Sequence, residues 1–267
     1  MSLSSHEAGP LERVLRAQRD KGRKLLVPYV TGGYDDDWLD VVRAVAAAGA
    51  DAIEVGLPFS DPVMDGPVIQ EASVRALERG TTPAGIIAAL ANADVGIPIA
   101  VMSYVNPIAH LGYRRAAMSL AASNIAGAIV PDLPLDEADE WREEAAAAGV
   151  DAVQLVAPTT PDERMRRICA AARGFVYAVG LLGVTGERGA VADSALLLAK
   201  RAKLMTDMPV LVGVGISTPD QAVAVSAVAD GVIVGSALVR RLLEGEGPSG
   251  AATFVQSLRD GLDASAT

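Results

Sequence analysis

The stretch AIEVGLP, residues 52–58, decides how this chain folds. Apolar, partly β-branched residues run almost without interruption until a glycine and a proline end them, as in a short strand buried on both faces. Strands of that kind are typical of parallel sheets, because helices cover both faces of such sheets. The stretch therefore predicts one strand of a sheet that is enclosed by helices.

The same pattern recurs on both sides of this stretch. Apolar runs lie at residues 25–33, 52–58, 98–104, 127–134, 152–158, 174–180, 209–215 and 231–238. Helices are predicted between them at 38–48, 83–92, 113–123, 136–148, 161–172, 191–206 and 219–229. Start signals stand at Asp136 and Thr160–Pro161, and stop signals at Gly49 and Gly149.

Strands that alternate with helices in this way predict an α/β fold, a closed (β/α)8 TIM barrel, with a doubly wound open sheet as the alternative. No linker or low-complexity tract divides the 267 residues. We therefore expect a single domain over residues 1–267, with mobile ends at 1–9 and 263–267.

The composition of the chain excludes several classes of function. The net charge of −10 argues against nucleic acid or an anionic membrane as partner. Backbone amides can still bind the phosphate of a small molecule without formal charge. Cys169 is the only cysteine, which excludes an intrachain disulfide. No apolar run suits a signal peptide or a membrane span, so a cytoplasmic location is expected.

Glu54 stands inside the apolar stretch and is the first catalytic candidate. If Ile53 and Val55 face the outer helices, Glu54 points into the barrel mouth, where barrel enzymes hold their catalytic groups. Apolar surroundings disfavour the charged carboxylate and raise its pKa into the range useful for proton transfer. The alternative is a structural ion pair. It is disfavoured because no Lys or Arg lies inside any of the runs, and Lys24 stands only at the edge of the first.

Two further carboxylates follow on the loop after this strand. Asp61 lies between Ser60 and Pro62, and Asp65 precedes Gly66. Both arrangements are turn signals, so the residues alone leave each acid open between a turn-forming and a functional role.

Glycine-rich turns end the last two strands, GVGIST (213–218) and VGSAL (234–238). Thr218 and Ser236 can each begin a helix, which would direct backbone N–H groups at the mouth and predicts a phosphate site there. The alternative is that these glycines only make tight turns. A third segment, GLLGVTGERG (180–189), suits a loop that closes over a substrate, and its Arg188 either reaches an anion or is solvated.

The rarer residues exclude other chemistries. The lysines, at 21, 24, 200 and 203, do not stand at strand ends, which disfavours a Schiff-base aldolase. Two histidines, His6 and His110, cannot form a multi-histidine site, and no metal is expected. Acid–base chemistry by carboxylates on a small phosphorylated substrate remains.

The segment IEVGLPFSDPVMDGPVIQ (53–70) resembles the signature of the tryptophan synthase α chain family. MSYVNP (102–107), PDLP (131–134), GVTG (183–186) and DGVIVGSALV (230–239) follow in the expected order. The resemblance implies a lyase of tryptophan biosynthesis. Such a lyase cleaves indole-3-glycerol phosphate to indole and glyceraldehyde 3-phosphate without a cofactor. It works in an α2β2 complex with a pyridoxal-phosphate-dependent β chain.

Roles follow from the resemblance only at matching positions. Glu54 would be the general acid/base, Asp65 would stabilise the cationic indole intermediate, and the loop of Asp61 would face the β chain. The indole pocket would be lined by Tyr29, Tyr104, Ile129 and Tyr177. The remaining substrate-binding positions, mainly around the phosphate, would be Thr185, Gly186, Gly215, Gly235 and Ser236.

The chain departs from the family pattern in three places. Gly180 and Leu181 stand where a Ser-Arg pair is common, GGYD (32–35) replaces a Gly-Asp-Pro run, and Val68 replaces threonine. Two alternative functions stay open at this point. One is a stand-alone paralogue that releases free indole, and the other is a non-catalytic barrel that binds a phosphorylated ligand.

Overall fold

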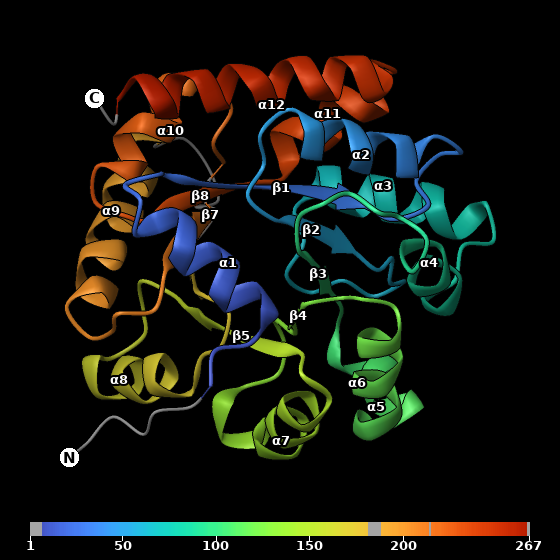
Figure 1. The fold of residues 1–267 in the computed structure, drawn as a ribbon, viewed down its shortest axis with the longest axis horizontal. Coiled ribbons are helices and arrows are strands. Elements are labelled where there is room, and N and C mark those ends of the chain that lie inside the picture. The colour runs from blue at the N-terminus through green and yellow to red at the C-terminus, as the bar shows by residue number, and fades with distance from the viewer. Residues whose placement is uncertain (1–6, 181–187, 214, 266–267) are drawn as a thin grey trace.

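The strands of this chain close into one parallel barrel (Figure 1). The structure, a computed structural model, describes residues 7–180, 188–213 and 215–265. Each strand pairs with its sequence neighbours, and β1 closes the ring against β8. The predicted single-domain (β/α)8 barrel is confirmed, and the open-sheet alternative is wrong.

Every strand lies within one of the predicted runs or within one residue of it. The strands are β1 (Leu25–Thr31), β2 (Ile53–Gly56), β3 (Ile99–Met102), β4 (Gly127–Ile129), β5 (Asp151–Val156), β6 (Val176–Val179), β7 (Val210–Gly213) and β8 (Gly231–Val234). The runs extend beyond most strands because their last residues, often Gly or Pro, form the loops at the mouth.

The helices surround this barrel. They are α1 (Pro10–Arg19), α2 (Trp38–Ala47), α3 (Pro67–Glu78), α4 (Pro83–Leu90), α5 (Val105–Leu111), α6 (Tyr113–Ala122), α7 (Asp139–Ala148), α8 (Asp162–Ala171), α9 (Arg188–Lys203), α10 (Pro219–Ser226), α11 (Ser236–Leu243) and α12 (Gly247–Ala264). A 3-10 turn, η1 (Leu135–Glu137), precedes α7, so the start signal at Asp136 marks this turn instead of the helix.

Five helices, α1, α3, α5, α11 and α12, were not among the predicted segments, although Ser236 was predicted as a possible helix start and begins α11. In α12, for example, Gly250 and Gly261 lower the helix propensity of the sequence. The helix forms because its inner face, with Phe254 and Leu258, is buried against the rest of the protein. This helix also includes Asp263, which the sequence analysis placed in a mobile tail. The Asp263 carboxylate is 2.7 Å from the guanidinium of the buried Arg259.

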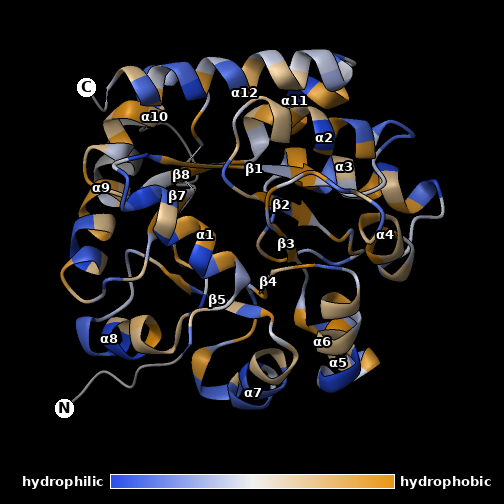
Figure 2. Ribbon diagram, viewed as in Figure 1, coloured by the Kyte–Doolittle hydropathy of each residue, from blue (hydrophilic) through white to orange (hydrophobic). Residues whose placement is uncertain are grey.

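Two apolar layers hold the fold together. Ile53, Val55 and Val101 belong to the layer between strands and helices, whereas Val27 and Leu211 belong to the layer inside the barrel. Figure 2 shows the strands as predominantly hydrophobic and the helices as two-sided. Alternate residues of each strand therefore point inward and outward.

Helix α1 closes one end of the barrel (Figure 1). Its Leu11 and Leu15 are fully buried and join the inner apolar layer. At the start of β5, the Asp151 carboxylate accepts the backbone N–H of Glu12 at 2.9 Å, which caps this helix from outside. Substrate access is thereby confined to the opposite end, where the strands finish.

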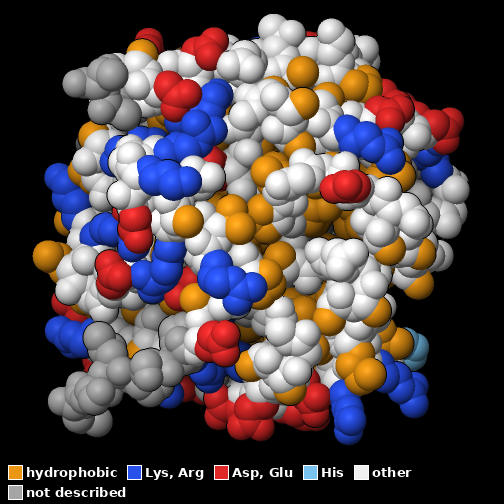
Figure 3. Space-filling model, in the orientation of Figure 1, with side chains coloured by type: hydrophobic (Ala, Val, Ile, Leu, Met, Phe, Trp, Pro, Cys, Tyr) orange, Lys and Arg blue, Asp and Glu red, His pale blue; other side chains and the backbone are white. Residues whose placement is uncertain are grey.

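On the face shown in Figure 3, basic and acidic side chains are interspersed over the outer helices. Within the described ranges, no helix combines the length and the apolar character that a membrane crossing requires.

Candidate active site

Glu54 lies at the centre of the mouth, on β2. Its neighbours Ile53 and Val55 pack outward, so its side chain points inward, where it is 2 % exposed. Oε2 has no hydrogen-bond partner among the described residues, and none of their ion pairs involves this carboxylate. Burial, with a smaller effect of the charge on Asp65, raises the pKa of Glu54 to about 8. The group therefore carries a proton at neutral pH.

Asp65 approaches the same space from the loop between β2 and α3. Burial raises its pKa to about 6, while a hydrogen bond from the Tyr104 hydroxyl acts in the opposite direction. At neutral pH Asp65 is thus mostly ionised while Glu54 is mostly protonated. Two carboxyl groups whose pKa values are separated by their surroundings can act as acid and as anionic stabiliser.

Tyr104 holds the Asp65 loop in place. Its hydroxyl accepts the backbone N–H of Met64 at 3.0 Å, and its ring stacks on Phe59 with centroids 5.3 Å apart. Asp132, at the end of β4, accepts the N–H of Val105 at 2.8 Å and so fixes the start of α5 beside Tyr104. Burial raises the pKa of Tyr104 to about 12, so its hydroxyl stays protonated.

Tyr29, Ile129 and Tyr177 are the other residues predicted to line the indole pocket. Tyr29 pairs directly with Glu54 across β1 and β2. Burial raises the pKa values of Tyr29 and Tyr177, and the charges of Glu54 and Asp65 raise both further. The structure thus brings both phenols to the two carboxyl groups. Ile129 is a buried residue of the inner layer on β4.

Two glycines at strand ends make room for these rings, a role that the sequence alone did not predict for them. A Cβ on Gly56 would collide with the Tyr29 hydroxyl, and one on Gly213 would lie 2.7 Å from the Tyr177 hydroxyl. A glycine inside a strand often marks such a close approach, and this signal could have found both positions.

The predicted phosphate positions lie at the ends of β7 and β8. Gly235 precedes α11, which begins at Ser236 and has no side-chain cap. Thr218 begins α10 as predicted, and its hydroxyl accepts the N–H of Gln221 at 3.3 Å. Gly215 is exposed and has a φ of 52°, a conformation that glycine adopts readily. Thr185 and Gly186 lie outside the described residues, as does the Arg188 side chain.

Asp61 lies on the outer part of the same loop as Asp65. Its exposed carboxylate accepts the Ser60 hydroxyl at 2.6 Å, a local turn contact. Val63 and Met64 beside it are 76 % and 51 % exposed. The loop therefore combines a half-buried acid, Asp65, with an exposed apolar tip.

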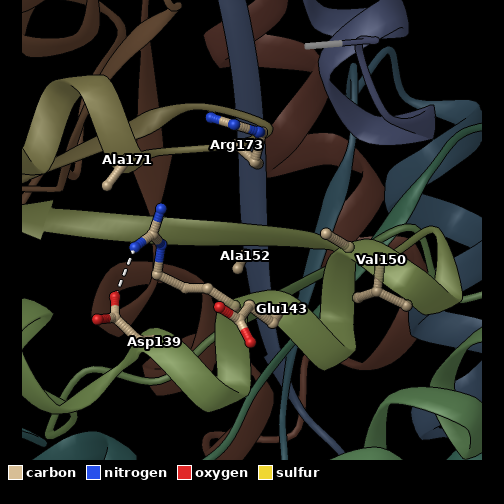
Figure 4. Close-up of a pocket in the computed structure, with 8 residues that line it drawn as sticks. Asp139, Glu143, Val150, Ala152, Ala171 and Arg173 are labelled. Carbon is tan, nitrogen blue, oxygen red and sulfur yellow. Dashed lines mark hydrogen bonds and ion pairs between the residues drawn. The ribbon is translucent and has the colours of Figure 1, made fainter. Parts of the chain in front are cut away.

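A separate pocket lies between α7, β5 and the end of α8 (Figure 4). Its polar lining is mixed, since Arg142 pairs with Asp139 at 3.0 Å and Arg173 and Glu143 stand nearby. Val150 and Ala152 place the pocket at the beginning of β5, at the opposite end of the strands from Glu54. It is not part of the mouth.

A closed (β/α)8 barrel whose mouth holds one protonated and one ionised carboxyl group is an enzyme of the acid–base class. The family model described as Tryptophan synthase alpha chain matches residues 15–264. The chain belongs to the tryptophan synthase alpha chain family.

Individual relatives match this chain along nearly its whole length. The chain is 48 % identical to the tryptophan synthase alpha chain of Thermobifida fusca, over 88 % of this chain and 89 % of the relative. It is 46 % identical to that of Halorhodospira halophila, over 92 % and 90 %. A chain of Mycobacterium tuberculosis tryptophan synthase superposes with a TM-score of 0.88 at 39 % identity, covering 96 % and 99 %. The subunit alpha of Legionella pneumophila gives 0.87 at 31 %, covering 97 % and 100 %.

Proposed function

We propose that this chain is the lyase subunit that cleaves indole-3-glycerol phosphate to indole and glyceraldehyde 3-phosphate in tryptophan biosynthesis. The observation that carries the proposal is Glu54, a buried carboxyl group with a pKa of about 8 and no cationic partner among the described residues. Such a group holds a proton at neutral pH and can give it to carbon. The family to which the chain belongs supports the choice of substrate.

The first step is protonation of the ring. Glu54 donates its proton to the indole carbon that bears the side chain, which leaves a carboxylate on Glu54 and a positive charge on the ring. Asp65, ionised at neutral pH, accepts a hydrogen bond from the ring N–H and stabilises that charge. The phenols of Tyr29 and Tyr177 and the side chain of Ile129 enclose the ring.

The second step breaks the carbon–carbon bond. The Glu54 carboxylate takes the proton of the hydroxyl on the carbon attached to the ring. As that carbon becomes an aldehyde, the bonding electron pair returns to the ring and neutralises it. Glu54 ends the cycle protonated, so no proton is gained or lost overall and no cofactor is required.

The phosphate is assigned to the uncapped start of α11. Backbone N–H groups at a helix N-terminus bind anions, and Gly235 allows close approach of the substrate. The Ser236 hydroxyl adds a donor. Gly215 stands at the end of the neighbouring strand β7, and the family resemblance adds Thr185 and Gly186.

We assign the contact surface for the partner subunit to the loop that carries Asp61. Exposed Val63 and Met64 give this loop an apolar tip that a β chain would cover, in an α2β2 complex. We assign the complex to the cytoplasm, because a phosphate ester does not readily cross an apolar bilayer.

An indole-release assay tests the proposal. The purified chain is incubated with indole-3-glycerol phosphate, alone and during titration with a purified tryptophan synthase β chain. We expect release of indole and a lyase rate that rises until the partner is saturating. A rate unchanged by the β chain would favour the stand-alone paralogue. No release under either condition would favour the non-catalytic barrel.

A further inference from the structure

Two buried oxygens at the mouth lack a well-formed hydrogen bond to any described residue, although the Tyr29 phenol lies close enough to Thr31 for a weak one, which acts to lower the pKa of Tyr29. They are Thr31 Oγ1 and Glu54 Oε2, on side chains of residues that are 1 % and 2 % exposed. A buried polar atom without a partner costs free energy, and native proteins normally supply a partner for it, from the protein, from water or from a ligand. Glu54 acts in the proposed reaction, whereas Thr31 takes no part in the steps described above.

The two oxygens face one space. Across β1 and β2, Tyr29 pairs with Glu54 and Thr31 pairs with Gly56. Alternate residues of a strand share a face, so all four positions face the interior of the barrel. Gly56 has no side chain, and the Tyr29 hydroxyl lies against it. Thr31, the Tyr29 phenol and Glu54 therefore converge around Gly56.

This space lies between the acid and the phosphate position. Strand β1 stands between β2, which carries Glu54, and β8, which leads to α11. The Tyr29 ring reaches from Gly235, where an added Cβ would lie 3.6 Å from the Tyr29 Cβ, to Gly56. Two strand spacings amount to about 10 Å. A ligand with its ring at Glu54 and its phosphate at α11 must lay its linking carbons over β1.

The chemistry of this space suits alcohol groups. A threonine hydroxyl, a phenol and a protonated carboxyl group are neutral donors and acceptors. No Lys or Arg of the described residues pairs with Glu54, so the space offers little to a phosphate or a carboxylate. Hydroxyl groups on the linking carbons would satisfy both unpartnered oxygens.

We propose that Thr31, together with the Tyr29 phenol and Glu54, forms a subsite for the hydroxyl groups on the carbon chain that links the indole ring to the phosphate. Thr31 is then a substrate-binding residue that selects a polyol link over a plain hydrocarbon one. The inference rests on the proposed function, because that function supplies the dihydroxylated substrate.

The test compares Thr31→Val, which keeps the shape and removes the hydroxyl, with Thr31→Ser, which keeps the hydroxyl. Two quantities are measured for each protein in the presence of the β chain. One is kcat/KM for indole-3-glycerol phosphate. The other is the inhibition constant of an analogue whose indole and phosphate are joined by three carbons without hydroxyls.

We expect Thr31→Val to lower kcat/KM about tenfold, as loss of one hydrogen bond does. The inhibition constant of the analogue should stay within about twofold, since the analogue has nothing to bond to Thr31. Thr31→Ser should recover most of the activity. Unfolding curves establish that both variants are folded.

Two results overturn the inference. An equal loss for substrate and analogue would mean that Thr31 only shapes the pocket, and unchanged kcat/KM in Thr31→Val would mean that its hydroxyl does nothing. In either of these results the wild-type protein still turns over its substrate, so the proposed function would stand. A wild-type protein that releases no indole would instead defeat the proposed function, and the inference would fall with it.

Discussion

Replacing Glu54 by glutamine should abolish turnover and, at the same time, stabilise the protein above acidic pH. Glutamine keeps the shape of the side chain but can neither donate a proton to carbon nor ionise. In the wild-type protein, burial raises the pKa of Glu54 from 4.5 to about 8. Between these two pH values the folded protein retains a proton that the unfolded chain has released.

The sign of the stability effect follows from this difference. A carboxyl group whose pKa is raised by folding contributes its full stability below 4.5 and loses it as the pH rises through about 8. At 1.36 kcal/mol for each pKa unit, the wild-type protein loses about 3 kcal/mol between pH 4 and pH 7, and about 5 kcal/mol in total. A glutamine side chain does not titrate, so the Glu54→Gln variant should gain these amounts relative to wild type.

Urea unfolding at pH 5, 7 and 9, followed by fluorescence of the buried Trp38 and Trp141, measures this gain. Indole release from the same samples measures turnover, which we expect to fall at least about 100-fold. Glu71→Gln, at an exposed position on α3, is the matched control and should show neither effect. A stability difference that stays constant with pH would contradict the raised pKa of Glu54, and a variant that keeps more than about a tenth of the activity would contradict its role as proton donor.

Three further predictions concern the same mouth. The profile of kcat/KM against pH should be bell-shaped, because activity needs Asp65 ionised and Glu54 protonated; its limbs should lie near about 6 and about 8, and a flat profile from pH 5 to 9 would contradict the assignment. Asp65→Asn should keep the loop but lose the anion, lowering kcat by about 100-fold or more in steady-state assays, whereas Asp61→Asn should retain most of the lyase rate of the isolated chain. Gly56→Ala should destabilise the protein by about 1–3 kcal/mol in urea unfolding, because the new Cβ displaces the Tyr29 ring; a variant as stable as wild type would show that the ring moves freely.

The barrel and its acid could be predicted because both depend on local patterns. Apolar runs alternating with helices specify a parallel barrel, and strand alternation turns Glu54 inward once Ile53 and Val55 face the helices. Asp65 was harder. Its neighbour Gly66 signals only a turn, and the path of the loop over the mouth depends on Tyr104, which lies far away in the sequence.

What the sequence could not specify depends on register and on contacts between distant segments. Thr31 is the last residue of β1, but only the pairing of Thr31 with Gly56 puts its hydroxyl in the space beside Glu54. The roles of Gly56 and Gly213 follow from which ring crosses them. Helix α1 was missed as the floor of the barrel, because the Asp151 carboxylate that caps it comes from β5, in another part of the chain.

The proton on Glu54 can be observed directly. NMR of the chain labelled with 13C at glutamate carboxyl groups, with Glu54→Gln to assign the signal, gives the titration midpoint of this one group. We expect a midpoint close to pH 8, far above that of exposed glutamates. A midpoint near 4.5 would mean that Glu54 is ionised at neutral pH and has no proton to give to the indole ring.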